Sequence, residues 1–359
     1  MRFLNEVSIM YESIEELVRK LSNAHGISGY EDEIRDIIKA ELEDHVDEIK
    51  VDRMGNIICV KNGRDYSQMI AAHMDEIGFM VKYIEDNGFL RITPIGGWFS
   101  QTALNQRVIL HGKKGRIVGV LGCKPPHFMR DDERKKVIDI KDMFIDVGAE
   151  SRDDVKEMGI DIGTPVTIDR ECVRLGNRIT GKAFDDRAGV AIMIEALKRT
   201  ESDATIYAVG TVQEEVGLKG ARTSSFALEP DVALAIDVAP STDYPGAESV
   251  KLDVKLDKGP VITVADAQGR GLIAPKAVVD WLVETAEKHG IDYQLEVGEG
   301  GTTDATAIHL TKAGIPTGVV SVPARYIHTP VEVISLKDVD LSAELVARAL
   351  ESAEKYIKK

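Results

Sequence analysis

The stretch DRAGVAIMIEALKRTESDATIYAVGTVQEEVG (186–217) decides the fold, because a helix and a buried strand follow each other within it. Residues 186–199 repeat apolar side chains at helical spacing, whereas TIYAVGTV (205–212) is a short, nearly continuous apolar run. Continuous apolar strands are typical of a largely parallel sheet that helices cover on both faces. Two adjacent glutamates, Glu214 and Glu215, stand where this strand ends.

The same alternation continues on both sides of this stretch. The apolar spacing predicts helices at 12–26, 31–45, 275–290 and 341–356, and strands at 48–53, 56–62, 68–73, 231–237 and 316–322. Between 76 and 172 the pattern changes to short strands, with one hairpin around Asn87-Gly88, a second at 107–122 and a strand at 162–168. We therefore predict an α/β catalytic domain with a mostly parallel sheet flanked by helices (1–75 and 173–359) and an inserted, small β-barrel-like domain (76–172).

The composition excludes several classes of protein. A formal net charge of -15 argues against nucleic acid as the main partner, since phosphate binding needs a basic face. No run approaches the roughly 18 apolar residues of a transmembrane helix, and the charged start lacks the cleavage site of a signal peptide. Cys59, Cys123 and Cys172 are widely spaced, which predicts free thiols in a reducing compartment. We expect a cytoplasmic protein that does not bind membranes, and we assign no role to the first ten residues.

Residue types that bind metals follow the predicted strands. In open α/β sheets, ligands bind at the carboxyl ends of the strands, so such residues are expected to meet at one edge. The candidates after strands, after a short loop or at a helix start are His73, Asp75, Asp185, Asp186, Glu214, Glu215, Asp237 and His328. Each alone has an ordinary explanation, such as a helix cap for Asp185 or a solvated loop for the glutamates. Their common location is what indicates a metal site.

The number of candidate ligands matches two metal ions. A catalytic zinc takes about three protein ligands and leaves one position open, and two ions can share a carboxylate. His73 and Asp237 would hold one ion, His328 and one of the paired glutamates the other, with Asp185 between them. The other glutamate would take a proton from the metal-bound water, and the spacing leaves open which glutamate does which. Asp75, two residues after His73, would accept its second ring N–H. Zinc suits these ligands best, while cobalt and manganese stay open.

Several motifs together resemble one known family. AAHMDEIGFMV, GKAFDDRAGV, VQEEVGLKGA, AIDVA and VPARYIHTPVEVI are similar to the motifs of the M42 metallopeptidases, the tetrahedral, dodecameric aminopeptidases of archaea and bacteria. The resemblance extends from residue 73 to about 333 and implies a fold like that of the zinc exopeptidases. It implies that Glu214 is the general base and Glu215 a ligand. It also implies that Asp185 bridges the metals, that Asp186 does not, and that the inserted domain mediates dimerisation before six dimers close into a hollow tetrahedron.

The expected function is therefore removal of N-terminal residues from short peptides, by attack of metal-bound hydroxide with Glu214 as general base. GEGGTTDATAIH (298–309) is similar to the glycine-rich loop beside the family's active site, so Thr302, Thr303 and Asp304 are candidates for peptide contacts, although a turn and helix cap explains them equally well. A two-metal deacylase or carboxypeptidase is the alternative, with Arg325 binding a substrate carboxylate. A glycosidase leaves the two histidines unexplained, and an inert metal scaffold leaves Glu214 unexplained. The sequence does not predict which N-terminal side chain is preferred.

Overall fold

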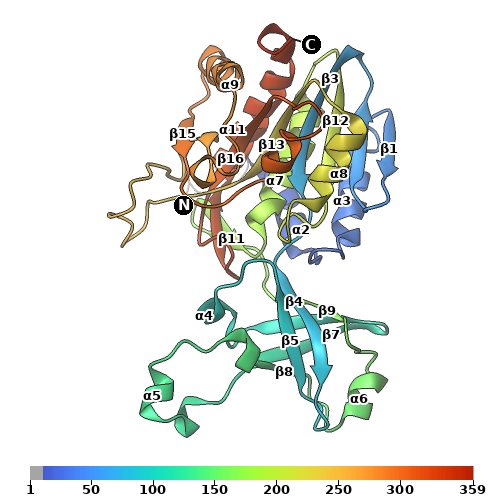
Figure 1. The fold of residues 1–359 in the computed structure, drawn as a ribbon, viewed down its shortest axis with the longest axis vertical. Coiled ribbons are helices and arrows are strands. Elements are labelled where there is room, and N and C mark those ends of the chain that lie inside the picture. The colour runs from blue at the N-terminus through green and yellow to red at the C-terminus, as the bar shows by residue number, and fades with distance from the viewer. Residues whose placement is uncertain (1–10, 359) are drawn as a thin grey trace.

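The computed structural model describes residues 11–358, which form an α/β domain and a smaller β-barrel (Figure 1). The chain passes from the α/β domain into the barrel after strand β3 and returns to it before strand β10. The first ten residues, to which the sequence assigned no role, lie outside the described part of the chain. None of the helices in residues 11–358 is long and apolar enough to cross a membrane.

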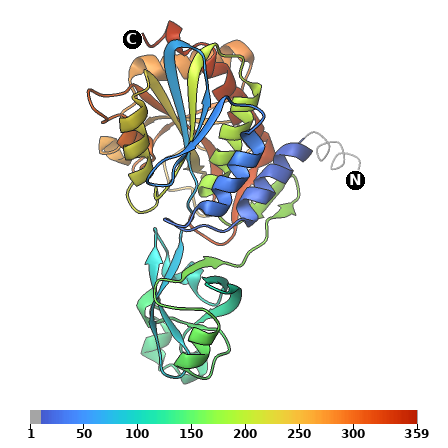
Figure 2. The same ribbon diagram turned by 90° about the vertical axis from the view of Figure 1, so that its right-hand side faces the viewer.

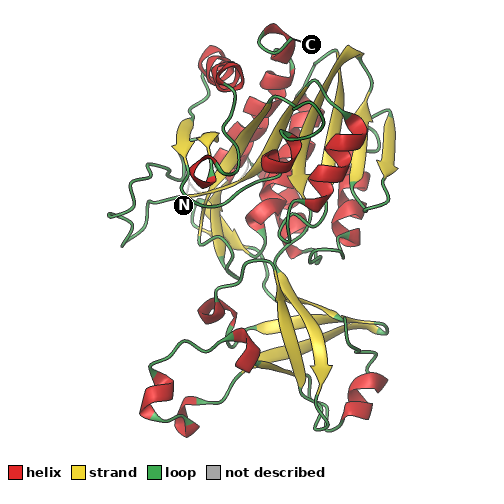
Figure 3. Ribbon diagram, viewed as in Figure 1, coloured by secondary structure: helices red, strands yellow, loops and turns green. Residues whose placement is uncertain are grey.

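Within the described residues, the α/β domain is built on a mixed sheet of 11 strands (Figure 3). Its centre is parallel, in the order β12 (Ala204–Thr211), β3 (Arg64–His73), β13 (Val232–Pro240) and β16 (Thr317–Arg325). Antiparallel strands extend both sides: β1 (Glu48–Val51) and β2 (Ile57–Lys61) beyond β12, and β17 (Glu332–Ser335), β11 (Arg178–Gly181) and β10 (Val173–Leu175) beyond β16. In addition, β14 (Val261–Ala265) pairs with β16 and with β15 (Gln294–Val297). The predicted α/β class is confirmed, and the sheet is mixed, with parallel pairs in its centre and between β14 and β15.

Helices cover both faces of this sheet, as the continuous apolar strands predict (Figure 2). On β3, Ile70 and Ala72 belong to the core under one set of helices, and Met69 and Ala71 belong to the core on the opposite face. The first face carries α2 (Glu12–Asn23), α3 (Asp32–Leu42), α7 (Phe184–Arg199), α9 (Lys276–His289) and α11 (Leu336–Leu350). The second carries α8 (Lys219–Leu228) and α10 (Ala305–Ile308). The alternation of side chains along a strand therefore supplies two cores.

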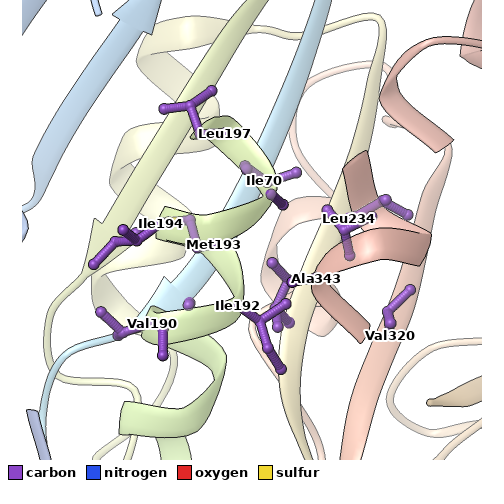
Figure 4. Close-up of a cluster of buried hydrophobic side chains, with 14 of the residues drawn as sticks. Ile70, Val190, Ile192, Met193, Ile194, Leu197, Leu234, Val320 and Ala343 are labelled. Atoms are coloured by element: carbon purple, nitrogen blue, oxygen red, sulfur yellow. The ribbon is translucent and has the colours of Figure 1, made fainter. Parts of the chain in front are cut away.

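Helix α7 is the centre of the larger core (Figure 4). Ile192 and Met193 are fully buried, and α7 contacts β3 and β13 on the sheet and α11 beside it. The close packing of such interiors makes the position of the helix start depend on the whole core. This core therefore holds Asp185, at the start of α7, against the edge of the sheet.

The inserted segment forms a closed barrel in the order β4-β5-β8-β7-β6-β9. The strands are β4 (Gly78–Ile84), β5 (Leu90–Ile95), β6 (Arg107–Gly112), β7 (Gly115–Gly122), β8 (Phe144–Asp146) and β9 (Pro165–Ile168). Both predicted hairpins are present, since β4 pairs with β5 around Asn87-Gly88 and β6 pairs with β7. The short helices α4 (Ser100–Ala103), α5 (Asp131–Arg134) and α6 (Arg152–Glu157) connect the strands. The charged run 130–136 contains α5.

Other parts of the chain add detail that the pattern did not predict. Helix α8 was missed because KGARTSSFAL has few large apolar side chains, and it packs through small ones such as Gly220 and Ala221. Short 3-10 turns occur at η1 (Pro126–Phe128), η2 (Ile140–Asp142), η3 (Ala267–Gly269) and η4 (Ala353–Lys355). Cys59, Cys123 and Cys172 are free thiols, and Cys59 and Cys172 are buried.

Candidate metal centre and active site

The carboxyl ends of the central parallel strands carry the predicted site. Strand β3 ends at His73, β12 ends three residues before Glu214, and Asp237 lies on β13. Because β12, β3 and β13 are neighbours that run in the same direction, their ends meet at one edge. The α7 start and the loop after β16 complete the edge. A cavity of about 510 Å³ is lined there by His73, Asp185, Glu214, Glu215, Asp237 and His328.

Asp185 lies between the two histidines. Its Oδ1 is 3.1 Å from Nε2 of His73, and its Oδ2 is 3.1 Å from Nε2 of His328. Nε2 of His328 is also 3.2 Å from Oε1 of Glu215. On the other side, ligand atoms of His73 and Asp237 lie within 4.8 Å of each other. The carboxylate of Asp185 thus presents one oxygen to His73 and the other to His328.

These spacings suit metal ions. Ligand atoms about 2.0–2.2 Å from a tetrahedral zinc lie roughly 3.3–3.5 Å from one another, close to the contacts between Asp185 and the two imidazoles. Oε1 of Glu215 is buried, and its contact with His328 lacks hydrogen-bond geometry, so this oxygen has no hydrogen-bond partner. Imidazole and carboxylate together are ligands for divalent transition metals. The residues present therefore fit divalent ions.

The site concentrates negative charge in a buried place. Burial raises the pKa of Glu214 well above that of an exposed glutamate, and Asp237 adds to this increase against the opposing effect of His73. Burial disfavours a charged imidazole, yet contacts with Asp185 and Glu215 raise the pKa of His328 to about 11. Beyond burial, both shifts reflect carboxylates that lie close together with little positive charge between them. Cations bound between them would supply that charge.

Asp75 and Asp186 surround the site without lining the cavity. Nδ1 of His73 is 3.1 Å from the carbonyl oxygen of Asp75 and 3.6 Å from its carboxylate, so the carbonyl is the nearer acceptor. The carboxylate of Asp75 instead accepts hydrogen bonds from the backbone N–H groups of Glu214 (3.0 Å) and Glu215 (3.2 Å). Asp186 accepts from the backbone N–H groups of His73 and Gly189.

Asp186 also lies near metal-type ligands. One of its oxygens is within 4.8 Å of ligand atoms of His73 and Asp237. Both of its oxygens already accept backbone hydrogen bonds, of 3.1 Å from His73 and 3.0 Å from Gly189. This arrangement ties the start of α7 to the end of β3.

Two further buried glutamates hold the loops of the site, and sequence reasoning missed both. Glu332 accepts hydrogen bonds from the backbone N–H of His328 (2.9 Å) and of Asp185 (3.1 Å). Glu31 accepts one from the backbone N–H of Gln213, next to Glu214 (3.1 Å). Glu332 stands in the quoted motif VPARYIHTPVEVI, but no local pattern indicates that its carboxylate turns back to two N–H groups.

A buried ion network lies beneath the site, at the junction with the barrel. The carboxylate of Glu76 accepts from Nζ of Lys182 at 2.8 Å, and Nη2 of Arg187 lies 3.3 Å away. Arg187 is fully buried and donates to the carbonyl oxygen of Met74. The network joins the segment after His73 to the segment around Asp185, so it supports the positions of both predicted ligands.

The candidate substrate residues are not all placed in the cavity. Thr302 and Thr303 line it. Asp304 is buried beside it and accepts a hydrogen bond from Oγ1 of Thr211 at 2.5 Å. Arg325 donates to both carboxylate oxygens of Asp243, at 3.0 and 2.6 Å, and does not line the cavity.

Comparison with known proteins shows the family of this chain. Residues 55–345 match the model of the family described as M42 glutamyl aminopeptidase. The chain belongs to the M42 family. It is 40% identical over 340-odd residues to the lysyl aminopeptidase of Pyrococcus furiosus, a match that covers 94% of this chain and 96% of that protein. Both the family and this relative are described as aminopeptidases, which are hydrolases, and this chain belongs among them.

Solved structures of two archaeal peptidases have the same fold. An aminopeptidase of the archaeon Desulfurococcus kamchatkensis superposes with a TM-score of 0.93 at 45% identity, covering 97% of this chain and 98% of that one. The TET1 peptidase of Pyrococcus horikoshii superposes with a TM-score of 0.84 at 35% identity, covering 93% and 98%, and is described as assembling into a tetrahedron or a large octahedral shell. The M42 fold therefore extends over nearly the whole chain.

Proposed function

We propose that this M42 protein is a two-metal aminopeptidase that releases the N-terminal residue of short peptides, with Glu214 as general base. The observation that carries the proposal is the position of Asp185, whose two oxygens lie 3.1 Å from Nε2 of His73 and of His328. A carboxylate shared in this way suits a pair of metal ions about 3.5–4 Å apart. His73 and Asp237 would hold one ion, and Glu215 and His328 the other.

The ions, when bound, would acidify a water molecule and polarise the peptide carbonyl. Glu214 would accept the proton of that water and pass it to the amine that leaves. Its carboxylate is suited to this step because Oε2 is 3.9 Å from Nε2 of His73, beyond hydrogen-bond distance, so it faces the centre without being held by that ring. Asp75 would orient Glu214, because its carboxylate accepts a hydrogen bond from the backbone N–H of Glu214.

The structure favours this function over the carboxypeptidase alternative. A carboxypeptidase needs a basic side chain to bind the substrate carboxylate. Arg325 is paired with Asp243, and among the residues that the structure describes neither a lysine nor an arginine lines the cavity. A carboxylate-rich cavity instead suits the positively charged amino terminus of a peptide.

The test is an assay of metal-loaded protein against free and N-acetylated aminoacyl anilides, beside Glu214→Gln. We expect cleavage of the free compounds alone, loss of at least about 100-fold in kcat in Glu214→Gln, and an unchanged content of about two ions per chain. Glu48→Gln, an exposed glutamate on β1, is the matched control and is expected to keep full activity. Cleavage of the acetylated compounds alone would support the deacylase, and full activity in Glu214→Gln would remove Glu214 from the mechanism. Metal analysis of the protein purified without added metal would identify zinc, cobalt or manganese.

We infer further that the barrel joins copies of the chain into a closed dodecamer built from dimers. The barrel exposes large apolar side chains, including Val118 (58% exposed), Val120 (48%) and Phe128 (74%), which are typical of a protein contact surface. Light scattering of wild type and of Val118→Asp tests this inference. We expect twelve chains in the wild type and a smaller particle in the variant, whereas a monomeric wild type would reject it.

A further inference from the structure

The cavity extends from the metal ligands across the sheet toward β14 and β15. Asp237 on β13 is the register partner of Ser321 on β16, and Ser321 pairs in turn with Val261 on β14. Register partners point to the same face, and so do residues two apart along one strand. Thr263 and its partner Glu296 on β15 therefore lie on the same face as Asp237. Asp237, Ser321, Thr263 and Glu296 line the cavity, whereas Val261 does not.

Two acidic side chains stand at this end of the cavity. Glu296 and Asp266, the residue that follows β14, line the cavity and are only 8% and 5% exposed. Oε2 of Glu296 accepts a hydrogen bond from Oγ1 of Thr263 at 3.3 Å, and Oδ1 of Asp266 accepts one from the N–H of Leu272 at 2.5 Å. Oδ2 of Asp266 is buried and has no hydrogen-bond partner. A buried carboxylate oxygen without a donor is costly, and a ligand with N–H groups would satisfy it.

The chain itself supplies little positive charge here. Within residues 11–358, neither lysine nor arginine lines the cavity. The positive charge that lowers the pKa of Asp266 is that of His309. Nδ1 of His309 is 2.9 Å from the carbonyl oxygen of Ala305. Burial raises the pKa of Asp266 and of Glu296, and the charge of Asp266 raises the pKa of Glu296 further. A cation bound between the two carboxylates would favour the ionised form of both.

We propose that Asp266 and Glu296 close a pocket for the side chain of the substrate's N-terminal residue and select lysine and arginine there. The proposal rests on the proposed aminopeptidase function, since it places the substrate's amino terminus at the metal centre. Glu296 is three strands from Asp237, about 14 Å between backbones at a spacing of about 4.8 Å. The side chains of the protein span part of this distance from each end, and the long side chain of a lysine or arginine spans the rest.

Other N-terminal residues fit this pocket less well. An apolar side chain leaves Oδ2 of Asp266 without a donor. A glutamate brings a third carboxylate to Asp266 and Glu296, and like charges in a buried site repel. The order of preference is therefore lysine and arginine first, neutral side chains of similar length next, and acidic side chains last.

The experiment compares kcat/KM of the full-length, metal-loaded protein for lysyl, arginyl, norleucyl and glutamyl aminomethylcoumarins. Norleucine has nearly the length of lysine without its charge. We expect the lysyl compound to exceed the norleucyl compound at least tenfold, and the glutamyl compound to be the poorest. In Glu296→Gln and in Asp266→Asn the ratio of lysyl to norleucyl kcat/KM should fall at least fivefold. Glu299→Gln removes the same charge from an exposed neighbour outside the cavity lining and should keep the ratio.

The outcomes separate this proposal from the proposed function. Cleavage of norleucyl as well as or better than lysyl compounds, or a ratio unchanged in both Glu296→Gln and Asp266→Asn, would overturn the pocket and keep the aminopeptidase. If the loaded protein cleaves none of the compounds, the proposed function fails, and binding of free L-lysine and L-norleucine by isothermal titration calorimetry decides the pocket by itself. Tighter binding of lysine, lost in Glu296→Gln, would support it, and equal or absent binding would overturn it.

Discussion

The backbone N–H of Glu214 donates a hydrogen bond of 3.0 Å to the carboxylate of Asp75. Asp75 is fully buried and lies two residues after His73, so one short segment carries a proposed metal ligand and also holds the proposed general base. The other oxygen of Asp75 accepts from the N–H of Glu215 and from Oγ of Ser28, at 3.2 and 2.6 Å. A change at Asp75 is therefore expected to disturb the base and the ligand together.

We predict that Asp75→Asn lowers kcat/KM about 10- to 100-fold while metal content is retained. The amide replaces one acceptor oxygen by an NH2 donor, which cannot accept from the backbone of Glu214 or Glu215. Ser28→Ala removes only the hydroxyl hydrogen bond and is expected to cost less activity. Steady-state kinetics and metal analysis check both variants, and an Asp75→Asn protein as active as Ser28→Ala would contradict the role of the two backbone contacts.

A second prediction concerns Glu332, whose carboxylate accepts hydrogen bonds from the backbone N–H groups of His328 and Asp185. Glu332→Gln keeps one acceptor oxygen and loses the other, so the segment of one of these two proposed ligands is no longer held. We expect metal affinity to fall about tenfold, measured by competition with a chelating dye. Glu16→Gln, on the exposed side of α2, is the matched control. Equal metal affinity in both variants would show that Glu332 does not position the ligands.

The junction between the domains is expected to weaken in acid. Nδ1 of His25 in the α/β domain and Nε2 of His111 in the barrel lie 2.7 and 2.9 Å from Oγ1 of Thr167. Burial lowers the pKa of His25 to about 2, together with the positive charges of Lys182, Arg116 and Arg187 and of His111 when protonated. The unfolded chain therefore binds a proton below about pH 6.5 that the folded chain excludes, so stability is complete above that pH and falls below it.

Unfolding by urea at pH 7.5 and pH 5.0 measures this effect. We expect His25 to account for a loss of about 1–2 kcal/mol in the free energy of unfolding between the two pH values. His25→Asn removes the titrating ring, so the variant should lose less than the wild type over the same range. Because His111 also has a lowered pKa, some acid sensitivity is expected to persist in the variant. An equal loss in both proteins would contradict the assignment to His25.

The core around α7 gives a prediction about stability. Ile192 is fully buried in the cluster that includes Leu234 and Ala343 (Figure 4). Ile192→Ala removes buried carbon atoms and leaves a cavity, so it should cost about 2–5 kcal/mol of unfolding free energy. Val51→Ala, at a side chain that is 54% exposed, should change it by less than about 0.5 kcal/mol. Chemical denaturation of both variants checks the difference, and similar midpoints would show that α7 is not rigidly packed.

Local pattern was enough to predict most elements and to select the candidate metal ligands. The hairpin at Asn87-Gly88 and the strand that ends at His73 follow from neighbours a few positions away in the chain. Because parallel strands end at one edge, His73, Glu214 and Asp237 could be brought together from their positions at or after the predicted strand ends. The roles of the paired glutamates came from the resemblance to the M42 family and stay predictions.

Other features depended on parts of the chain that are far apart. The sequence of α8 has too few large apolar side chains to indicate a helix, and only the sheet beneath it supplies a surface to pack on. Glu332 was not predicted as a support because its partner Asp185 is 147 positions away. Asp266 and Glu296 also stand in unremarkable local sequence, and only the pairing of β14 with β15 and β16 places them in the cavity.

The sequence by itself determined the alternation of helices and strands, the inserted β domain and the metal-type residues at strand ends. Those features depend on periodicity and residue type within a few positions, because the repeat of a helix or a strand sets the spacing of its buried side chains. Only the tertiary structure decided that Asp185 turns one oxygen to each of His73 and His328, and that two buried carboxylates stand at the far end of the cavity. Such relations are set by strand order and by the burial of side chains against distant partners, and no local pattern contains them.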